Sequence, residues 1–177
     1  MDEIDSLLSS RRDGENESSR RIKTEFLLQF EGMLTESDEK LVVLAATNRP
    51  QELDDAALRR FTKRIYVEMP DIIGRKSLLE SLLKKTGSPL SNSEIEKLAK
   101  ITDGYSCSDI TNLAKDAAMA PLREISQDEI LRMKAENMRK LNLSDFLKSS
   151  ERVRKSLNPA SLAQYLKWNR DYGDIST

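Results

Sequence analysis

The chain has 177 residues, and its 29 Lys and Arg against 30 Asp and Glu give a formal net charge of −1. It contains no His and one Cys, which excludes His-dependent catalytic triads, His-ligated zinc, internal disulfides and four-cysteine zinc sites. The near-neutral charge argues against a nucleic-acid-binding surface, and no apolar run approaches the roughly 18 residues of a membrane span.

The first part of the chain, about residues 1–70, is predicted to be α/β. Residues 17–34 carry apolar side chains at helical spacing, which predicts an amphipathic helix. These side chains are Ile22, Phe26, Phe30 and Met33. The continuous apolar run 41–46 predicts a strand buried on both faces, as in a parallel sheet, and residues 65–67 predict a second short strand.

From residue 71 onward the pattern is almost wholly helical. The predicted helix starts are Asp71, Ser91, Ser106, Ser144 and Asn158. Ser91 with Glu94 and Ser106 with Asp109 form capping boxes. Pro121 is expected to end or kink its helix, residues 126–141 to form a shorter helix, and Gly173 to stop the last one.

The predicted architecture is an incomplete α/β layer followed by a small helical bundle. We expect residues 1–70 to be the end of an α/β subdomain, 71–157 a helical subdomain, and 158–177 a C-terminal helix. Two or three strands do not close a stable doubly wound sheet unaided.

Two candidate sites carry side chains that are typical of strand ends. At the end of a strand, Asp2 could hold Mg²⁺ through water while Glu3 polarises an attacking water, although alone the pair is better explained as a solvated chain end. Asn48 directly follows the strand at 41–46, where open α/β sheets bind ligands. It could contact a γ-phosphate or hold the lytic water, or belong to an ordinary Asn-Arg-Pro turn.

Arginines and a loop complete the candidates. The adjacent Arg59 and Arg60 suit stabilisation of a transferring phosphoryl group, or form a surface pair with nearby acids. The loop with Gly104, Ser106, Cys107 and Ser108 opens onto a helix N-terminus. Its amide groups could receive an adenine edge or a phosphate, or the loop is an ordinary cap.

A basic loop and an aromatic stripe are two further candidates. The loop carries Arg11, Arg12, Arg20 and Arg21, which could grip an acidic peptide or form a solvated charged run. The aromatic stripe at residues 165, 168 and 172 suits core packing or a subunit contact.

In this order the motifs resemble those of the AAA ATPases, specifically the spastin-like, microtubule-severing branch of the meiotic clade. Residues 2–8 look like the Walker B segment, 46–50 like sensor 1, 53–61 like the arginine-finger segment, and 103–109 like the sensor-2 loop of the helical lid. The spastin-like runs are 19–27, 48–54, 113–118 and 165–174. The resemblance covers essentially the whole chain.

The resemblance implies an ATP- and Mg²⁺-dependent, hexameric motor. In it Asp2 would support Mg²⁺, Glu3 would activate water, Asn48 would sense the γ-phosphate, and Arg59 with Arg60 would reach the neighbouring subunit's nucleotide. The loop at 104–108 would lie at the nucleotide. The loop at 11–21 would be a pore loop that grips acidic tubulin tails. The implied location is the cytoplasm, on the cytoskeleton, with the nucleus as a further compartment.

Two departures from this pattern matter. Cys107 stands where the family usually has Gly, so strain is expected if that position approaches adenine closely or needs positive φ. The six glycines, at 14, 32, 74, 87, 104 and 173, form no G-x-x-x-x-G-K-[ST] phosphate loop, and the resemblance begins inside Walker B. We therefore expect this polypeptide alone to bind ATP weakly or not at all and to show no turnover.

Other functions fit the same motifs. Katanin-like or fidgetin-like severing enzymes and ATPases that disassemble endosomal-sorting filaments share them. A short non-catalytic module that docks onto full-length subunits, through the edge with Arg59 and Arg60 and the helix at 159–172, is the alternative outside enzymology.

Overall fold

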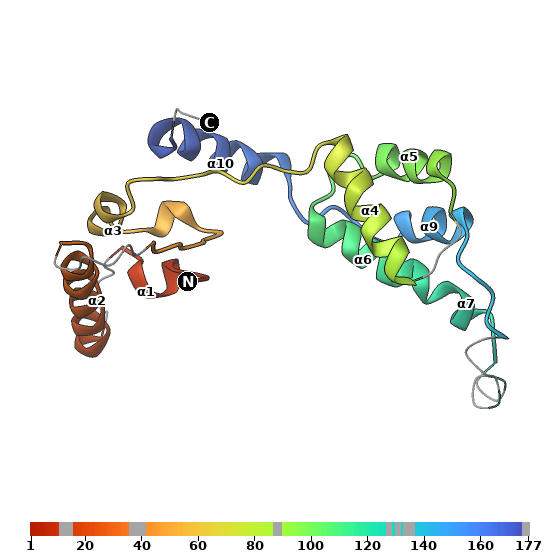
Figure 1. The fold of residues 1–177 in the computed structure, drawn as a ribbon, viewed down its shortest axis with the longest axis horizontal. Coiled ribbons are helices and arrows are strands. Elements are labelled where there is room, and N and C mark those ends of the chain that lie inside the picture. The colour runs from red at the N-terminus through yellow and green to blue at the C-terminus, as the bar shows by residue number, and fades with distance from the viewer. Residues whose placement is uncertain are drawn as a thin grey trace. The chain divides into compact units, whose positions relative to one another are not determined.

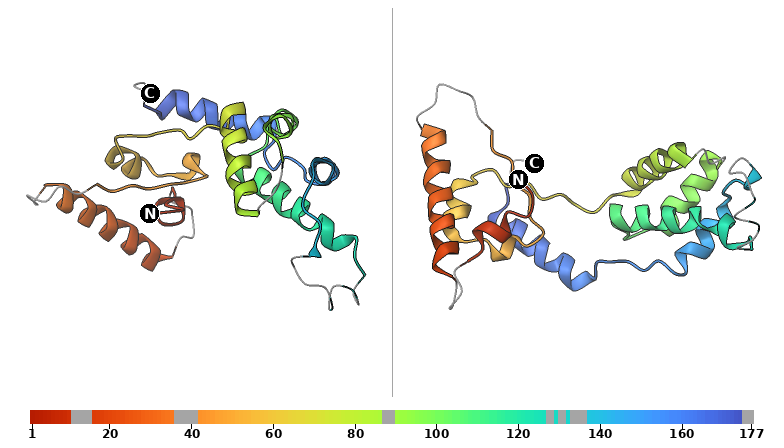
Figure 2. Two further views of the ribbon diagram at one scale, coloured as in Figure 1. Left: turned by 45° about the vertical axis from the view of Figure 1, so that its right-hand side comes forward. Right: turned by 90° about the horizontal axis from the view of Figure 1, so that it is seen from below.

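The computed structural model describes residues 1–10, 16–35, 42–86, 90–126, 129, 132 and 137–174. The chain divides into two units, whose helices are labelled in Figure 1 and seen from two further sides in Figure 2. The first unit comprises Met1–Tyr66 with Leu162–Thr177, and the second comprises Val67–Ser161. Each has its own buried cluster, so each is described by itself.

The first unit packs short helices around a small apolar centre. Its elements are α1 (Asp5–Leu8), α2 (Glu17–Thr35), the 3₁₀ turn η1 (Pro50–Glu52), α3 (Asp55–Arg60) and the C-terminal α10 (Pro159–Tyr172), which joins this unit from Leu162 on. Ile4, Leu8 and Ala57 are buried, with Leu53 and Phe61 packed against them. The sequence segments on either side of η1 thus meet in one cluster.

The predicted helix over residues 17–34 is confirmed as α2, but only part of its apolar stripe is buried. Phe30 is buried, and its ring centre lies 5.1 Å from that of Phe61. Ile22 is 58 % exposed, and the side chain of Met33 lies outside the described ones. The helix therefore attaches to its unit through its phenylalanines.

The local structure predicted for the two apolar runs is corrected. Residue 41 lies outside the described part; within that part, neither 42–46 nor 65–67 is a strand of a sheet. Val42 is 87 % exposed and Val67 86 %. A strand buried on both faces needs partners on its edges and helices over its faces, and the described residues give 42–46 only one short neighbour.

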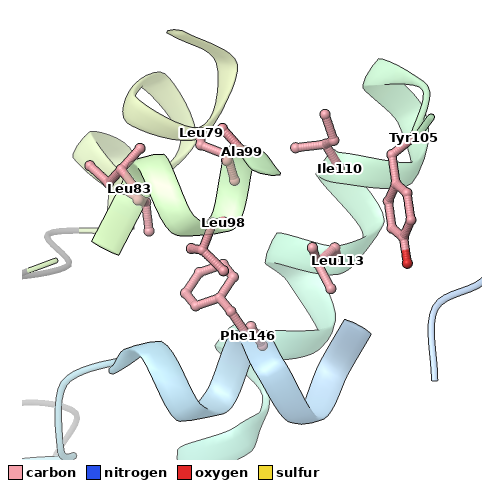
Figure 3. Close-up of a cluster of buried hydrophobic side chains, with 10 residues drawn as sticks. Leu79, Leu83, Leu98, Ala99, Tyr105, Ile110, Leu113 and Phe146 are labelled. Atoms are coloured by element: carbon pink, nitrogen blue, oxygen red, sulfur yellow. The ribbon is translucent and has the colours of Figure 1, made fainter. Parts of the chain in front are cut away.

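The second unit is the predicted helical bundle. It contains α4 (Ile72–Thr86), α5 (Asn92–Ile101), α6 (Cys107–Ala118), α7 (Ala120–Arg123) and α9 (Leu143–Ser150). Figure 3 shows Phe146 of α9 pointing toward Leu98 of α5, with Leu113 of α6 nearby; all three are at most 1 % exposed. Sequence-distant helices are thus joined by one core.

Local capping chemistry sets most helix boundaries in this unit. The capping boxes of Ser91 and Ser106 are confirmed, and Pro121 lies in the first turn of α7 after α6 has ended. The cap of α9 is Asn142 instead of Ser144, because the Asn142 side chain accepts from the amide of Asp145. The helix expected within 126–141 falls largely outside the described residues.

A buried arginine fastens the start of α4. Arg75 donates from Nε to the carbonyl of Ala99 (3.0 Å) and from Nη1 to that of Pro70 (3.0 Å), and pairs with Asp103 (3.1 Å). It thus ties α4 to the end of α5 and to the loop that follows.

Over the described part of the chain, no helix has the length and apolarity to cross a membrane.

Candidate functional site

The N-terminal segment pairs with the residues that lead to Asn48. The Met1 amino group donates to the Leu44 carbonyl (2.7 Å), and the Ala46 amide donates to the Met1 carbonyl (2.9 Å). The Ile4 amide donates to the Ala46 carbonyl (3.1 Å). The first two bonds have the register of parallel strands. The structure therefore brings the two N-terminal acids beside the segment that ends at Asn48.

The two acids are exposed at the turn into α1. Oδ1 of Asp2 accepts the Glu3 amide (2.9 Å), and the Glu3 carbonyl accepts the Ser6 hydroxyl (2.8 Å). Glu3 has φ of 50°, the one positive value at a non-glycine among the described residues. Such backbone costs about 1–2 kcal/mol, so the turn holds the Glu3 carboxylate in a direction that an extended strand would not give.

Asn48 sits in a turn fixed by its neighbour. The Thr47 hydroxyl donates to Oδ1 of Asp5 (2.5 Å) and accepts from the Arg49 amide (2.9 Å). This relay anchors the turn to α1, which begins directly after the acids. Asn48 itself is exposed, and its side chain has no hydrogen-bond partner among the described residues. Its amide is therefore available to a ligand.

The adjacent arginines of α3 differ in their surroundings. Arg60 is partly buried, donating to Oε2 of Glu31 (2.7 Å) and to the Ala56 carbonyl (3.1 Å). Arg59 is exposed and has no partner among the described residues. Neither pairs with the adjacent acids at the start of α3, as the described contacts show. Arg60 is committed to the fold of this unit, whereas Arg59 is free to meet an external group.

The loop before α6 lies in the second unit. Gly104 has φ of 72°, where glycine avoids the strain of a side chain. The Ser106 amide donates to Asp109, whose own amide donates to Oγ of Ser106 (3.1 Å). The cap thus occupies the Ser106 amide, one of the groups predicted to be open to a ligand. Cys107 and Ser108 lie in the first turn of α6, where φ is not positive, so the backbone strain expected for a positive φ at Cys107 does not arise.

Asp109 is 4 % exposed and joins this loop to a distant segment. It accepts from the amide (3.2 Å) and hydroxyl (3.1 Å) of Ser156. Beside it the Tyr105 hydroxyl donates to the Val153 carbonyl (2.7 Å). Burial acts to raise the pKa of Asp109, but the hydrogen bonds from Ser106 and Ser156 outweigh burial and leave the pKa below its usual value.

The variant Asp109→Asn is expected to lose about 2 kcal/mol of unfolding free energy at pH 7, because an amide cannot accept all these bonds. The folded pKa is lowered, so the stabilisation is present above the unfolded value of about 3.9 and lost as pH falls below it. Urea unfolding at pH 7 and pH 3 measures this, with exposed Glu151→Gln as control. An equal deficit at both pH values would contradict it.

The basic loop is only partly described. Arg11 and Arg12 lie outside the described residues. Arg20 and Arg21 are exposed in the first turn and a half of α2, and Arg21 pairs with Glu17 (2.7 Å). The described half of the loop thus presents positive charge on a helix start.

Sequence reasoning missed three residues that hold the site. Asp5 and Thr47 form the anchor of the Asn48 turn, and the Tyr165 hydroxyl donates to the Asn48 carbonyl (2.8 Å). Asp5 lies only three residues after Asp2, so its position is a local signal. Tyr165 lies 117 residues from Asn48, so no local pattern reveals it.

Two family models match the chain, one almost entirely in the first unit and one in the second. The profile of AAA, the ATPase family associated with various cellular activities, matches residues 1–69, and that of the AAA+ lid domain matches residues 92–146. Spastin of Danio rerio is 54 % identical over 176 residues, and spastin of Homo sapiens is 51 % identical over 176. Those stretches are 99 % of this chain but 31 % and 29 % of the relatives. The chain thus spans under a third of the curated relatives it matches.

Solved structures give the same fold. The crystal structure of a FIGL-1 AAA domain in complex with ADP matches with a TM-score of 0.88 and 43 % identity, over 98 % of this chain and 57 % of that chain. A structure concerned with katanin self-assembly matches with a TM-score of 0.75 and 35 % identity, over 94 % and 56 %. The predicted fold class, the end of an α/β subdomain followed by a helical lid and a C-terminal helix, is thereby confirmed.

Proposed function

Because the chain belongs to the AAA ATPases and is spastin-like along nearly its whole length, we propose that it forms the water-activating and arginine-donating part of a microtubule-severing motor. The observation that carries this is the parallel pairing of Met1 with the segment before Asn48. It sets the two acids and Asn48 at the carboxyl ends of neighbouring segments, where open α/β sheets bind ligands.

The exposed side chains fit a nucleotide with Mg²⁺. ATP with Mg²⁺, when bound, supplies the phosphoryl group that is transferred. Mg²⁺ is commonly held by one or two carboxylates together with waters and phosphates, and Asp2 offers one carboxylate. No cluster of three or more potential ligands occurs in the described residues, which suits a metal that arrives with its substrate. Asp2 and Glu3 have no ion-pair partner within that part of the chain.

Each residue then has a separate role. Glu3 accepts a proton from the attacking water, and the Asn48 amide orients that water or the γ-phosphate. Arg59 extends to the nucleotide of a neighbouring subunit, where its charge offsets that of the transition state.

The substrate class follows from the spastin-like resemblance, and the charge of the described arginines is compatible with it. Arg20 and Arg21 at the start of α2, together with the positive charges of Arg11 and Arg12, would attract acidic tubulin tails in the pore, an interaction that salt should weaken. The motor is a hexamer on cytoplasmic microtubules.

The test is a chimera in which residues 1–177 replace the matching segment of Danio rerio spastin, which supplies the rest of the motor. We expect ATP hydrolysis and microtubule severing, and a kcat about 10²–10⁴-fold lower for Glu3→Gln, because a general base contributes that much. Glu151→Gln, exposed in the second unit, is the matched control. Turnover that survives Glu3→Gln would exclude Glu3 as the base.

A further inference from the structure

The C-terminal helix α10 is fastened to the first unit at two separated points. Near its middle, the Tyr165 hydroxyl donates to the Asn48 carbonyl (2.8 Å). Just past its end, the Asp174 amide donates to the Arg64 carbonyl (3.0 Å), and the Asp174 carboxylate pairs with Lys63 (2.5 Å). One rigid element therefore spans the Asn48 turn and the segment that follows α3.

The bond from Tyr165 is the second hydrogen bond on the peptide group that follows Asn48. The Asn48 carbonyl and the Arg49 amide belong to this one planar group, and the Arg49 amide already donates to the Thr47 hydroxyl (2.9 Å). That bond stays within the turn, whereas Tyr165 donates to the carbonyl end from α10 (2.8 Å). Bonds to both ends of the peptide group together limit its rotation, and this group adjoins the Cα that carries the Asn48 side chain.

The contact between Asp174 and Arg64 connects α10 to the helix of Arg59. Arg64, whose carbonyl accepts from Asp174, donates from Nη1 to the Leu58 carbonyl (3.0 Å). Leu58 precedes Arg59 on α3. A continuous series of bonds thus joins α10 to the helix that carries Arg59.

Little apolar burial accompanies these bonds. No residue of α10 is fully buried, Leu166 is 51 % exposed, and the Trp168 ring packs on Tyr172 of the same helix at 5.4 Å. Removing one hydroxyl from this surface should therefore leave the fold intact, and any effect on the Asn48 turn reports the hydrogen bond itself.

We propose that Tyr165 is a positioning residue that orients Asn48 for hydrolysis, and that α10 ties the Asn48 turn to the helix of Arg59. This inference rests on the proposed function of Asn48. The helix α10 would then fix the position of Asn48, which acts on the nucleotide of its own subunit. It would also fix the position of Arg59, which acts on the nucleotide of the neighbouring subunit.

The first experiment tests the contact in the 177-residue chain. Loss of a hydrogen bond to a carbonyl shifts its ¹³C resonance upfield, so we expect Tyr165→Phe to move the Asn48 carbonyl upfield. Tyr172→Phe is the matched control, because its hydroxyl has no hydrogen-bond partner among the described residues. An unmoved Asn48 carbonyl in Tyr165→Phe would overturn the inference.

The second experiment measures the consequence in the Danio rerio chimera. Tyr165→Phe should lower kcat about three- to tenfold at unchanged KM for ATP and unchanged thermal unfolding, whereas Tyr172→Phe should change none of these. Equal kcat in both variants rejects the positioning role. An inactive parent chimera rejects the proposed function, and the positioning role with it, while the resonance experiment still reports whether the contact exists.

Discussion

Replacing Arg139 by Met is expected to destabilise the second unit by about 3 kcal/mol. Arg139 donates to both carboxylate oxygens of Asp145 (2.7 and 2.9 Å) and to those of Glu124 (both 2.6 Å). Asp145 is 1 % exposed, so the variant would leave a buried charge without its cation, which commonly costs 3–5 kcal/mol. We take the lower end because the Arg139 side chain is 34 % exposed.

The pH dependence separates this charge effect from lost packing. The hydrogen bond from Arg139 holds the pKa of Asp145 below its usual value. Its stabilisation is therefore present above about pH 3.9, and is lost as pH falls through the folded pKa. Urea unfolding with amide exchange in α6 and α9 should show a deficit at pH 7 that shrinks at pH 3. Exposed Arg154→Met is the control, and a deficit independent of pH would point to packing alone.

Local chemistry made the helical bundle predictable. Ser91 and Ser106 each sit three residues before an acid that returns the hydrogen bond, so the sequence alone locates the starts of α5 and α6. The same logic placed the start of α9 two residues late. Asn142 and Ser144 are both good caps, and the choice is made by Asp145, which stands three residues after Asn142 and forms a capping box with it.

The apolar runs show where local reasoning fails. The apolar run 42–46 has the same sequence whether it forms a strand buried on both faces or an exposed extended segment. The outcome depends on residues elsewhere in the chain that must cover the strand. The described partner of this run is the segment from Met1 to Ile4, which supplies three hydrogen bonds and leaves Val42 exposed.

The arginine pair is a similar case within the site. Arg59 and Arg60 are adjacent and chemically identical, so no pattern separates them. The distinction arises because Glu31, on α2, lies against one side of α3 and binds Arg60 (2.7 Å). Residue type could be predicted, but the division of roles depends on a contact across 29 positions.

Replacing Arg59 by Ala in the Danio rerio chimera is expected to lower kcat by about 10³–10⁵-fold, the range over which an arginine supplied to a phosphoryl-transfer site acts. Its unfolding free energy should stay unchanged, because Arg59 is exposed and has no partner among the described residues. Arg60→Ala should instead lower the stability of the first unit, because Glu31 and the Ala56 carbonyl lose their donor. Arg170→Ala, exposed on α10, is the control for removal of a positive charge.

Mixing two inactive variants tests whether Arg59 acts on the nucleotide of a neighbouring subunit. Arg59→Ala subunits keep Glu3, and Glu3→Gln subunits keep Arg59. Mixing the two inactive chimeras should therefore restore turnover at interfaces where an intact Glu3 meets a neighbour's Arg59. Complementation requires that the two side chains serve one site from different chains. If the mixture stays as inactive as its components while assembling normally, then Arg59 acts within its own subunit or not on the nucleotide at all.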